Sequence, residues 1–112
     1  MKRGDVVLVT APGNYDGDYG KPRPALLVQT ELFSDHPSVT ICLLTSHITQ
    51  TPLFRYSLEP CVENGLSSPS QVQIDKIMTI PRGKIGAIIG QLTAKQMSEI
   101  TRLLALWIGI AE

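Results

Sequence analysis

The residues best placed to do chemistry lie where a stiff turn meets an apolar strand. Arg23 stands between Pro22 and Pro24, and the apolar run 25–28 follows at once. Each proline fixes its own φ at roughly −65° and disfavours helical geometry in the residue before it. A guanidinium held on such a backbone is suited to binding a phosphate or a carboxylate through paired hydrogen bonds. An exposed arginine beside a strand is also common without any such role.

Two further groups of reactive side chains accompany apolar strands. Thr45, Ser46 and His47 follow the apolar run 41–44, and Asp75 stands among short apolar segments. A hydroxyl can donate a hydrogen bond to phosphate, an imidazole can act as acid or base near neutral pH, and a carboxylate can act as a base. The ordinary alternatives are a hydroxyl that bonds the local backbone, a surface histidine and a turn aspartate.

Short strands and one final helix must position these residues. The long loop 11–22, rich in Gly, Pro and Asp, is of a kind that is usually functional. One helical turn is expected over 31–34. β-branched and apolar segments separated by Gly, Pro and Asn predict the strands, which cover 6–10, 25–30, 38–45, 54–58, 71–74, 77–80 and 87–90.

A helix is predicted to start at Thr93 and to stop at Gly109. Thr93 and Gln96 have the spacing of a capping box. One apolar stripe recurs at helical spacing and is expected to pack in the core or a dimer interface: Met97, Ile100, Leu103, Leu104, Trp107 and Ile108. The fold class is therefore mainly β, a small bent β-barrel plus a C-terminal helix. Because several strands are apolar on both faces, the outer face needs the helix or a second subunit to cover it.

Composition indicates one globular domain over residues 1–112. Hydrophobic residues make up 43% and charged residues 18% of the chain. The longest apolar run, 103–110, is too short to span a bilayer, and the N-terminus does not resemble a signal peptide, so we expect a cytoplasmic protein. Two cysteines and two histidines fall in no ligand pattern, so no metal or cofactor is expected.

The net charge of zero is unusual for a protein that binds nucleic acid. The basic residues are clustered, however, with Lys21 close to Arg23 and with Lys76, Arg82 and Lys84 in a second group. Such clusters are compatible with a local basic groove on a neutral protein. Because the overall field is weak, the affinity for RNA is predicted to be modest and sensitive to salt.

The order of these segments resembles the MazF/PemK family of toxins from toxin–antitoxin modules. No single mark is specific, but their order and spacing extend over nearly the whole chain. The marks are Arg3-Gly4-Asp5, Arg23-Pro24-Ala25, Leu44-Thr45-Ser46, the 75–80 segment, and Ile89-Gly90 with Leu92. The resemblance implies an SH3-like barrel of the MazF/PemK/CcdB type that forms a two-fold homodimer.

The resemblance also implies sequence-specific cleavage of single-stranded RNA without a metal. The ribose 2′-hydroxyl attacks the neighbouring phosphate and leaves a 2′,3′-cyclic phosphate and a 5′-hydroxyl. Such a reaction needs a base, an acid and donors for the developing phosphate charge. Arg23 matches the family's R-P arginine, which would hold the scissile phosphate, and Thr45 matches its strand-end threonine.

Asp75 matches an aspartate that the PemK branch uses as a base. That branch has an arginine two positions earlier, whereas this chain has Gln73. The partner cation is therefore missing at this position, although Gln73 could still bind a phosphate or a base edge. The other residues expected to contact RNA are Asp18, Tyr19, Lys21, Ser46 and His47.

The resemblance names partners and leaves alternatives open. A MazE/PemI-like antitoxin would lay a flexible, often acidic tail across the RNA groove. A non-catalytic toxin like CcdB, which binds gyrase, shares the fold, and a degenerate member could act only in DNA regulation beside its antitoxin. Arg23-Pro24 and Thr45 favour the nuclease, whereas Gln73 and the neutral charge favour the alternatives.

Overall fold

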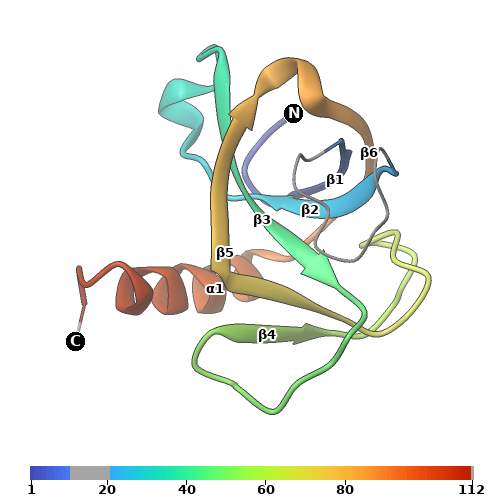
Figure 1. The fold of residues 1–112 in the computed structure, drawn as a ribbon, viewed down its shortest axis with the longest axis vertical. Coiled ribbons are helices and arrows are strands. Elements are labelled where there is room, and N and C mark those ends of the chain that lie inside the picture. Colours follow the sequence, from blue (N-terminus) through green and yellow to red (C-terminus); the bar gives the residue numbers. More distant parts are fainter. Residues whose placement is uncertain (11–20, 112) are drawn as a thin grey trace.

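The computed structural model describes residues 1–10 and 21–111. They form a six-stranded antiparallel sheet in the order β4-β5-β3-β2-β1-β6, followed by one helix (Figure 1). The prediction of a mainly-β fold with a C-terminal helix is confirmed. The elements are β1 Asp5–Val9, β2 Arg23–Leu27, η1 Glu31–Phe33, β3 Ser38–Thr45, β4 Arg55–Leu58, β5 Ser70–Pro81, η2 Arg82–Lys84, β6 Ile85–Gln91 and α1 Ala94–Trp107.

Strand β5 is a single long strand, so the prediction of two short strands around a turn is wrong. Asp75 lies within β5 rather than in a turn. The first part of β5 pairs with β4 and with the end of β3, and its second part pairs with the start of β3. The register between β3 and β5 shifts between Cys42, which pairs with Ile77, and Leu44, which pairs with Val72. The polar residues at 75 and 76 lie in this bulge, so they interrupt the apolar pattern without ending the strand.

Two apolar clusters fill the two faces of the curved sheet. One contains Val7, Val9, Leu27 and Ile41 with their neighbours, and the partly buried Ile85 from β6 packs against it. The other contains Val6, Leu26, Cys42 and Val72 together with the buried side of α1. The helix therefore covers the second apolar face, as the two-sided apolar strands require.

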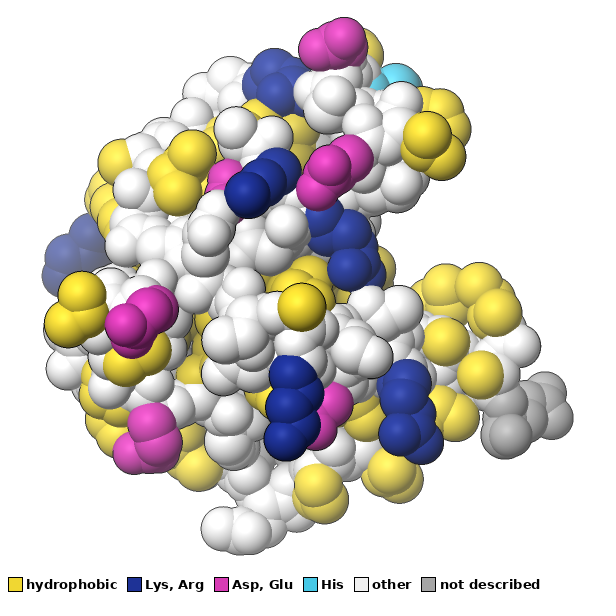
Figure 2. Space-filling model, turned by 180° about the vertical axis from the view of Figure 1, so that it is seen from behind, with side chains coloured by type: hydrophobic (Ala, Val, Ile, Leu, Met, Phe, Trp, Pro, Cys, Tyr) yellow, Lys and Arg dark blue, Asp and Glu magenta, His cyan; other side chains and the backbone are white. Residues whose placement is uncertain are grey.

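Helix α1 begins and ends where the sequence predicts. The Thr93 hydroxyl accepts from the Gln96 backbone N–H at 3.1 Å, the Gln96 side chain accepts from the Thr93 N–H at 2.9 Å, and Gly109 adopts φ 81°. Met97, Ile100 and Leu104 are buried. Trp107 is half exposed because the last turn of the helix projects past the sheet, where hydrophobic side chains gather (Figures 1 and 2).

The described residues contain no helix that is long and apolar enough to cross a membrane.

Candidate functional site

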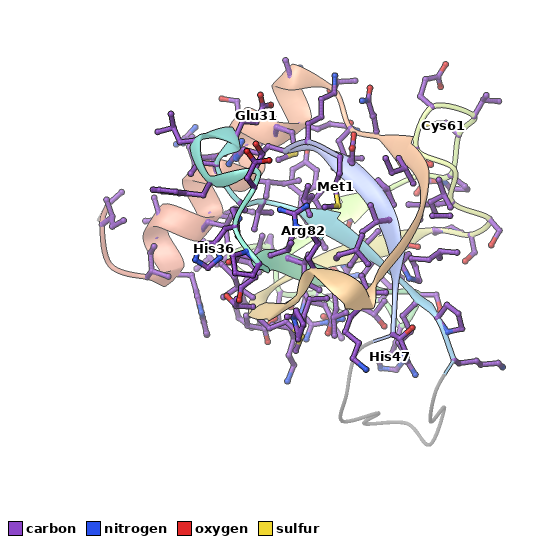
Figure 3. The ribbon with its side chains drawn as sticks, turned by 90° about the horizontal axis from the view of Figure 1, so that it is seen from above. Met1, Glu31, His36, His47, Cys61 and Arg82 are labelled. Carbon is purple, nitrogen blue, oxygen red and sulfur yellow. The ribbon has the colours of Figure 1, made fainter. Side chains whose placement is uncertain are left out.

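A groove of about 350 Å³ opens where β2 begins and β3 ends. Figure 3 shows His47 at this end of the molecule, away from Glu31 and His36. Three segments supply the walls: the start of β2, the end of β3, and the chain that leads into β5. The lining residues are Arg23, Pro24, Leu44, Thr45, Ser46, His47, Leu66, Ser67, Ser68 and Ser70.

Strand register brings Arg23 and Thr45 to the same place. Ala25 pairs with Leu43 in the last pair of the β2–β3 ladder, so Arg23 and Thr45 each lie two residues beyond that pair, and both line the groove. Residues two apart along a strand point to the same face of the sheet. The ladder between β2 and β3 stops at Ala25, next to Pro24, which has no N–H to continue it. The two strand ends are therefore free to separate, and the groove lies between them.

Arg23 is the first residue of β2, whereas the sequence predicts it just outside a strand that begins at Ala25. Arg23 pairs with Val9 of the neighbouring strand β1, and Pro24 pairs with Leu8 of the same strand. A proline is tolerated at such a position because it lies at the end of a strand. The pairing fixes the backbone of Arg23 more firmly than the prolines alone would.

The Thr45 hydroxyl is oriented by the local backbone. Its Oγ1 accepts a hydrogen bond from the His47 backbone N–H at 3.1 Å. A hydroxyl that accepts in this way keeps its own proton for donation to another oxygen. The backbone contact and a contact to phosphate are thus compatible roles for the same group. Ser46 and His47 are exposed on the rim beside it.

The third wall of the groove was missed in the sequence. Ser67, Ser68 and Pro69 have the composition of a turn, and Leu66 is a single apolar residue ahead of them. Gln71 pairs with Thr45, so the residues just before β5 must reach the end of β3. The serine residues directly before β5 were the one sequence feature that could have indicated a wall of the groove. That feature is informative only when the pairing of Gln71 with Thr45 is known.

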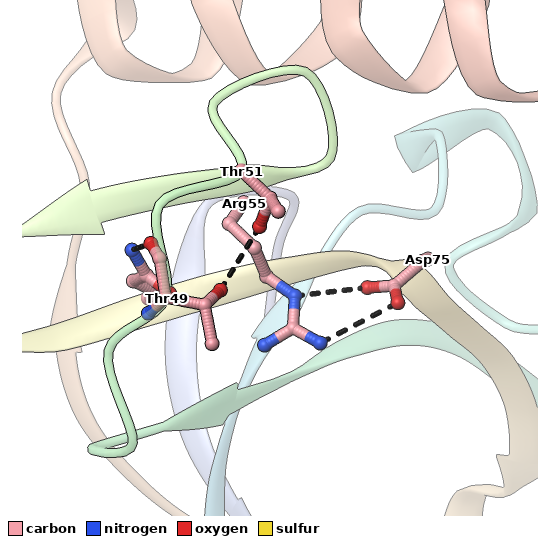
Figure 4. A network of polar contacts seen from close by, with 5 residues as sticks. Thr49, Thr51, Arg55 and Asp75 are labelled. Carbon is pink, nitrogen blue, oxygen red and sulfur yellow. Dashed lines mark hydrogen bonds and ion pairs between the residues drawn. The ribbon is translucent and has the colours of Figure 1, made fainter.

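Asp75 has a cation partner, but the partner comes from another strand. Arg55 of β4 lies opposite Gln73, and its Nε donates to Asp75 Oδ1 at 3.1 Å, with a longer contact of 3.4 Å from Nη2 to Oδ2 (Figure 4). The two side chains are only 14% and 18% exposed. Neither Gln73 nor Asp75 is among the groove-lining residues. The structure thus separates these two candidates from Arg23 and Thr45.

The remaining candidates divide between an exposed position and an undescribed one. Lys21 is exposed ahead of β2 and does not line the groove. Asp18 and Tyr19 lie outside the described residues. On the face in Figure 2, Lys and Arg side chains are interspersed with Asp and Glu, in keeping with the neutral charge of the chain.

Cys42 does not line the groove and is not accessible for chemistry there. It is fully buried in β3, and burial, followed by the nearby Asp75 charge, raises the pKa of its thiol to about 12. A thiol with so high a pKa is a poor nucleophile at neutral pH. Within residues 1–10 and 21–111, no three His, Cys, Asp or Glu side chains are grouped so that they could hold a metal ion.

Comparison with known proteins shows the family to which this chain belongs. The sequence model of the PemK-like, MazF-like toxins of type II toxin–antitoxin systems matches residues 2–108. The chain is 39% identical over 111 residues, 99% of either chain, to a probable endoribonuclease MazF of Mycolicibacterium smegmatis. The chain therefore belongs to the PemK-like, MazF-like toxin family.

Solved structures share the fold. The Mycobacterium tuberculosis toxin MazF-mt6 superposes with a TM-score of 0.79 at 23% identity, covering 96% of this chain and 99% of that one. A mycobacterial endoribonuclease in complex with its cognate antitoxin superposes with a TM-score of 0.78 at 24% identity, covering 100% and 98%. The SH3-like barrel expected from the family resemblance is thereby confirmed.

Proposed function

We propose that this toxin is an endoribonuclease that cleaves single-stranded RNA in the groove between β2 and β3. The observation that carries the proposal is the groove itself, which holds a guanidinium and a strand-end hydroxyl on opposite strands. The relative from Mycolicibacterium smegmatis bears the name of a probable endoribonuclease. An RNA target would put the activity in the cytoplasm.

The reaction exchanges one phosphorus–oxygen bond for another. The 2′-oxygen forms a bond to phosphorus and loses its proton to a base, while the bond to the 5′-oxygen breaks and that oxygen takes up a proton. Arg23 offsets the charge that grows on the phosphate, and the Thr45 O–H donates to a non-bridging oxygen. Strand pairing fixes the backbone at both positions, Arg23 against Val9 and Thr45 against Gln71, which limits the reorganisation needed when charge develops.

Proton transfer has two candidates. His47 lines the groove and is exposed on its rim, within the surface that would receive the ribose. Asp75 lies further along β5, outside the residues that line the groove, with its carboxylate oriented by Arg55. To act as the base it must come within hydrogen-bond reach of the 2′-hydroxyl of the scissile ribose. Asp75→Asn and His47→Gln test the two separately. The pH profile of kcat then distinguishes the roles, because loss of the base removes the acidic limb of the profile and loss of the acid removes its alkaline limb.

Two partners complete the proposal. The structural relative bound to its cognate antitoxin supports an antitoxin partner for this chain. We expect an antitoxin of the MazE/PemI type, and we expect it to cover the groove. The exposed apolar end of α1 supports a homodimer, since Trp107 and Ile108 are each at least half exposed. A gyrase-binding role like that of CcdB is not favoured, because the matching relative carries the name of a nuclease.

The test is cleavage of single-stranded RNA by the purified chain in excess EDTA, with analysis of the product ends. Wild-type protein should leave 2′,3′-cyclic phosphates and 5′-hydroxyls. Arg23→Ala should cut the rate at least about a hundredfold, the scale seen when one preorganised donor is removed from an oxyanion site. Arg102→Ala is the matched control, because Arg102 is exposed on α1 and does not line the groove. Intact RNA with wild-type protein would overturn the proposal.

A further inference from the structure

The third wall of the groove, Leu66, Ser67 and Ser68, is fixed from both sides. Before it, the Asn64 side chain is only 2% exposed and makes three hydrogen bonds to the backbone. Its Oδ1 accepts from the N–H groups of Cys61 at 3.1 Å and Leu66 at 3.0 Å, and its Nδ2 donates to the carbonyl of Glu59 at 2.9 Å.

The same segment is also tied to the edge of the sheet. The Gln91 N–H of β6 donates to the carbonyl of Glu63 at 2.8 Å. Gly65 and Gly90 allow the close approach. A Cβ at Gly65 would lie 2.0 Å from the carbonyl oxygen of Ile89, and one at Gly90 would lie 2.3 Å from the carbonyl carbon of Asn64. Gly65 also has φ 69°, which favours glycine.

The far side of the wall is held by the start of β5. The Ser70 hydroxyl, which is buried, donates to the carbonyl of Ser68 at 3.0 Å. Ser67 and Ser68 are nevertheless exposed to the groove. A surface segment with two exposed hydroxyls and both ends fastened is preorganised in the way that selective binding requires.

The two sides of the groove offer different chemistry. Arg23 and Thr45 supply a cation and a donor, which suit a phosphate. Ser67 and Ser68 supply neutral hydroxyls that both donate and accept, and Leu66 supplies an apolar surface beside them. Single-stranded RNA is read through hydrogen bonds to base edges and through apolar contact with base faces. Hydroxyls suit base edges because those edges present donors and acceptors together.

We infer that the Leu66–Ser68 wall contacts the base next to the scissile phosphate and sets part of the cleavage sequence, and that Asn64 is its positioning residue. This rests on the proposed ribonuclease activity. A base whose edge matches the two hydroxyls is held against Leu66, while its phosphate lies between Arg23 and Thr45. A base without matching groups covers one or both hydroxyls and leaves them unpaired, which lowers the rate at that sequence.

The experiment compares cleavage rates over a pool of short single-stranded RNAs with randomised positions, read by sequencing. The variants are Ser67→Ala, Ser68→Ala and the double variant, with Ser98→Ala on the exposed face of α1 as the matched control. The double variant should reduce by about tenfold the preference at one position beside the cleaved bond, because each hydroxyl contributes a single hydrogen bond. Ser98→Ala should keep the wild-type ranking.

Asn64→Ala is expected to lower the melting temperature and to weaken the same sequence preference at temperatures where circular dichroism shows the fold intact. An unchanged ranking in the double variant, with cleavage still present, would overturn the inference and leave the proposed function standing. Absence of cleavage by wild-type protein would overturn the proposed function and this inference together.

Discussion

Replacing Thr45 with valine removes one hydroxyl and keeps the shape of the side chain. In the folded protein the hydroxyl oxygen accepts from the His47 N–H at 3.1 Å. That N–H lies at an exposed strand end, where water can take the place of the lost acceptor, so we expect a stability loss below about 1 kcal/mol. If the same hydroxyl donates to a charged phosphate oxygen, its removal costs the transition state about 1.5–3 kcal/mol. The rate should then fall by roughly 10- to 150-fold.

The assay is single-turnover RNA cleavage in excess EDTA, paired with thermal unfolding of each variant. Thr45→Ser keeps the hydroxyl and should stay within about threefold of wild type on the same free-energy scale. A valine variant that cleaves as fast as wild type would refute the reasoning, because the hydroxyl would then have no contact with the reacting phosphate. A large stability loss in the valine variant would assign Thr45 a structural role instead.

Four further predictions test the contacts that stabilise the rest of the structure. Arg55→Gln and Asp75→Asn should each lower the unfolding free energy by about 1–3 kcal/mol, because each strands a mostly buried partner, and the double variant should lose less than the sum, as measured by urea denaturation. Iodoacetamide at mildly alkaline pH should label the exposed Cys61 and not Cys42, by mass spectrometry. The raised pKa of Cys42 stabilises the fold below about pH 9, and this contribution should be lost as pH rises toward about 12. Gly65→Ala should lower the free energy of unfolding by at least about 2 kcal/mol, because the added Cβ would clash with the Ile89 carbonyl.

Local sequence signals gave reliable predictions where the structure they describe is local. The capping box of Thr93 and Gln96 and the stop at Gly109 depend on a few adjacent residues, and the structure confirms them. The approach of Arg23 to Thr45 was also predictable, since two consecutive strands usually pair and their ends then meet.

The features that were missed depend on pairing between distant segments. Arg55 and Asp75 are 20 residues apart and meet only because β4 and β5 pair in one register. The same applies to Gly65 and Gly90, where a loop presses against an edge strand. A single sequence does not reveal such registers, because a shift by one residue changes every partner while leaving the local pattern intact.

The most direct test of the central claim is the crystal structure of this toxin with a short RNA whose scissile ribose is 2′-deoxy. Without its 2′-hydroxyl this RNA binds but cannot be cut. We predict a phosphate within hydrogen-bond distance of both the Arg23 guanidinium and the Thr45 hydroxyl. A phosphate bound elsewhere, with this groove left open, would contradict the account.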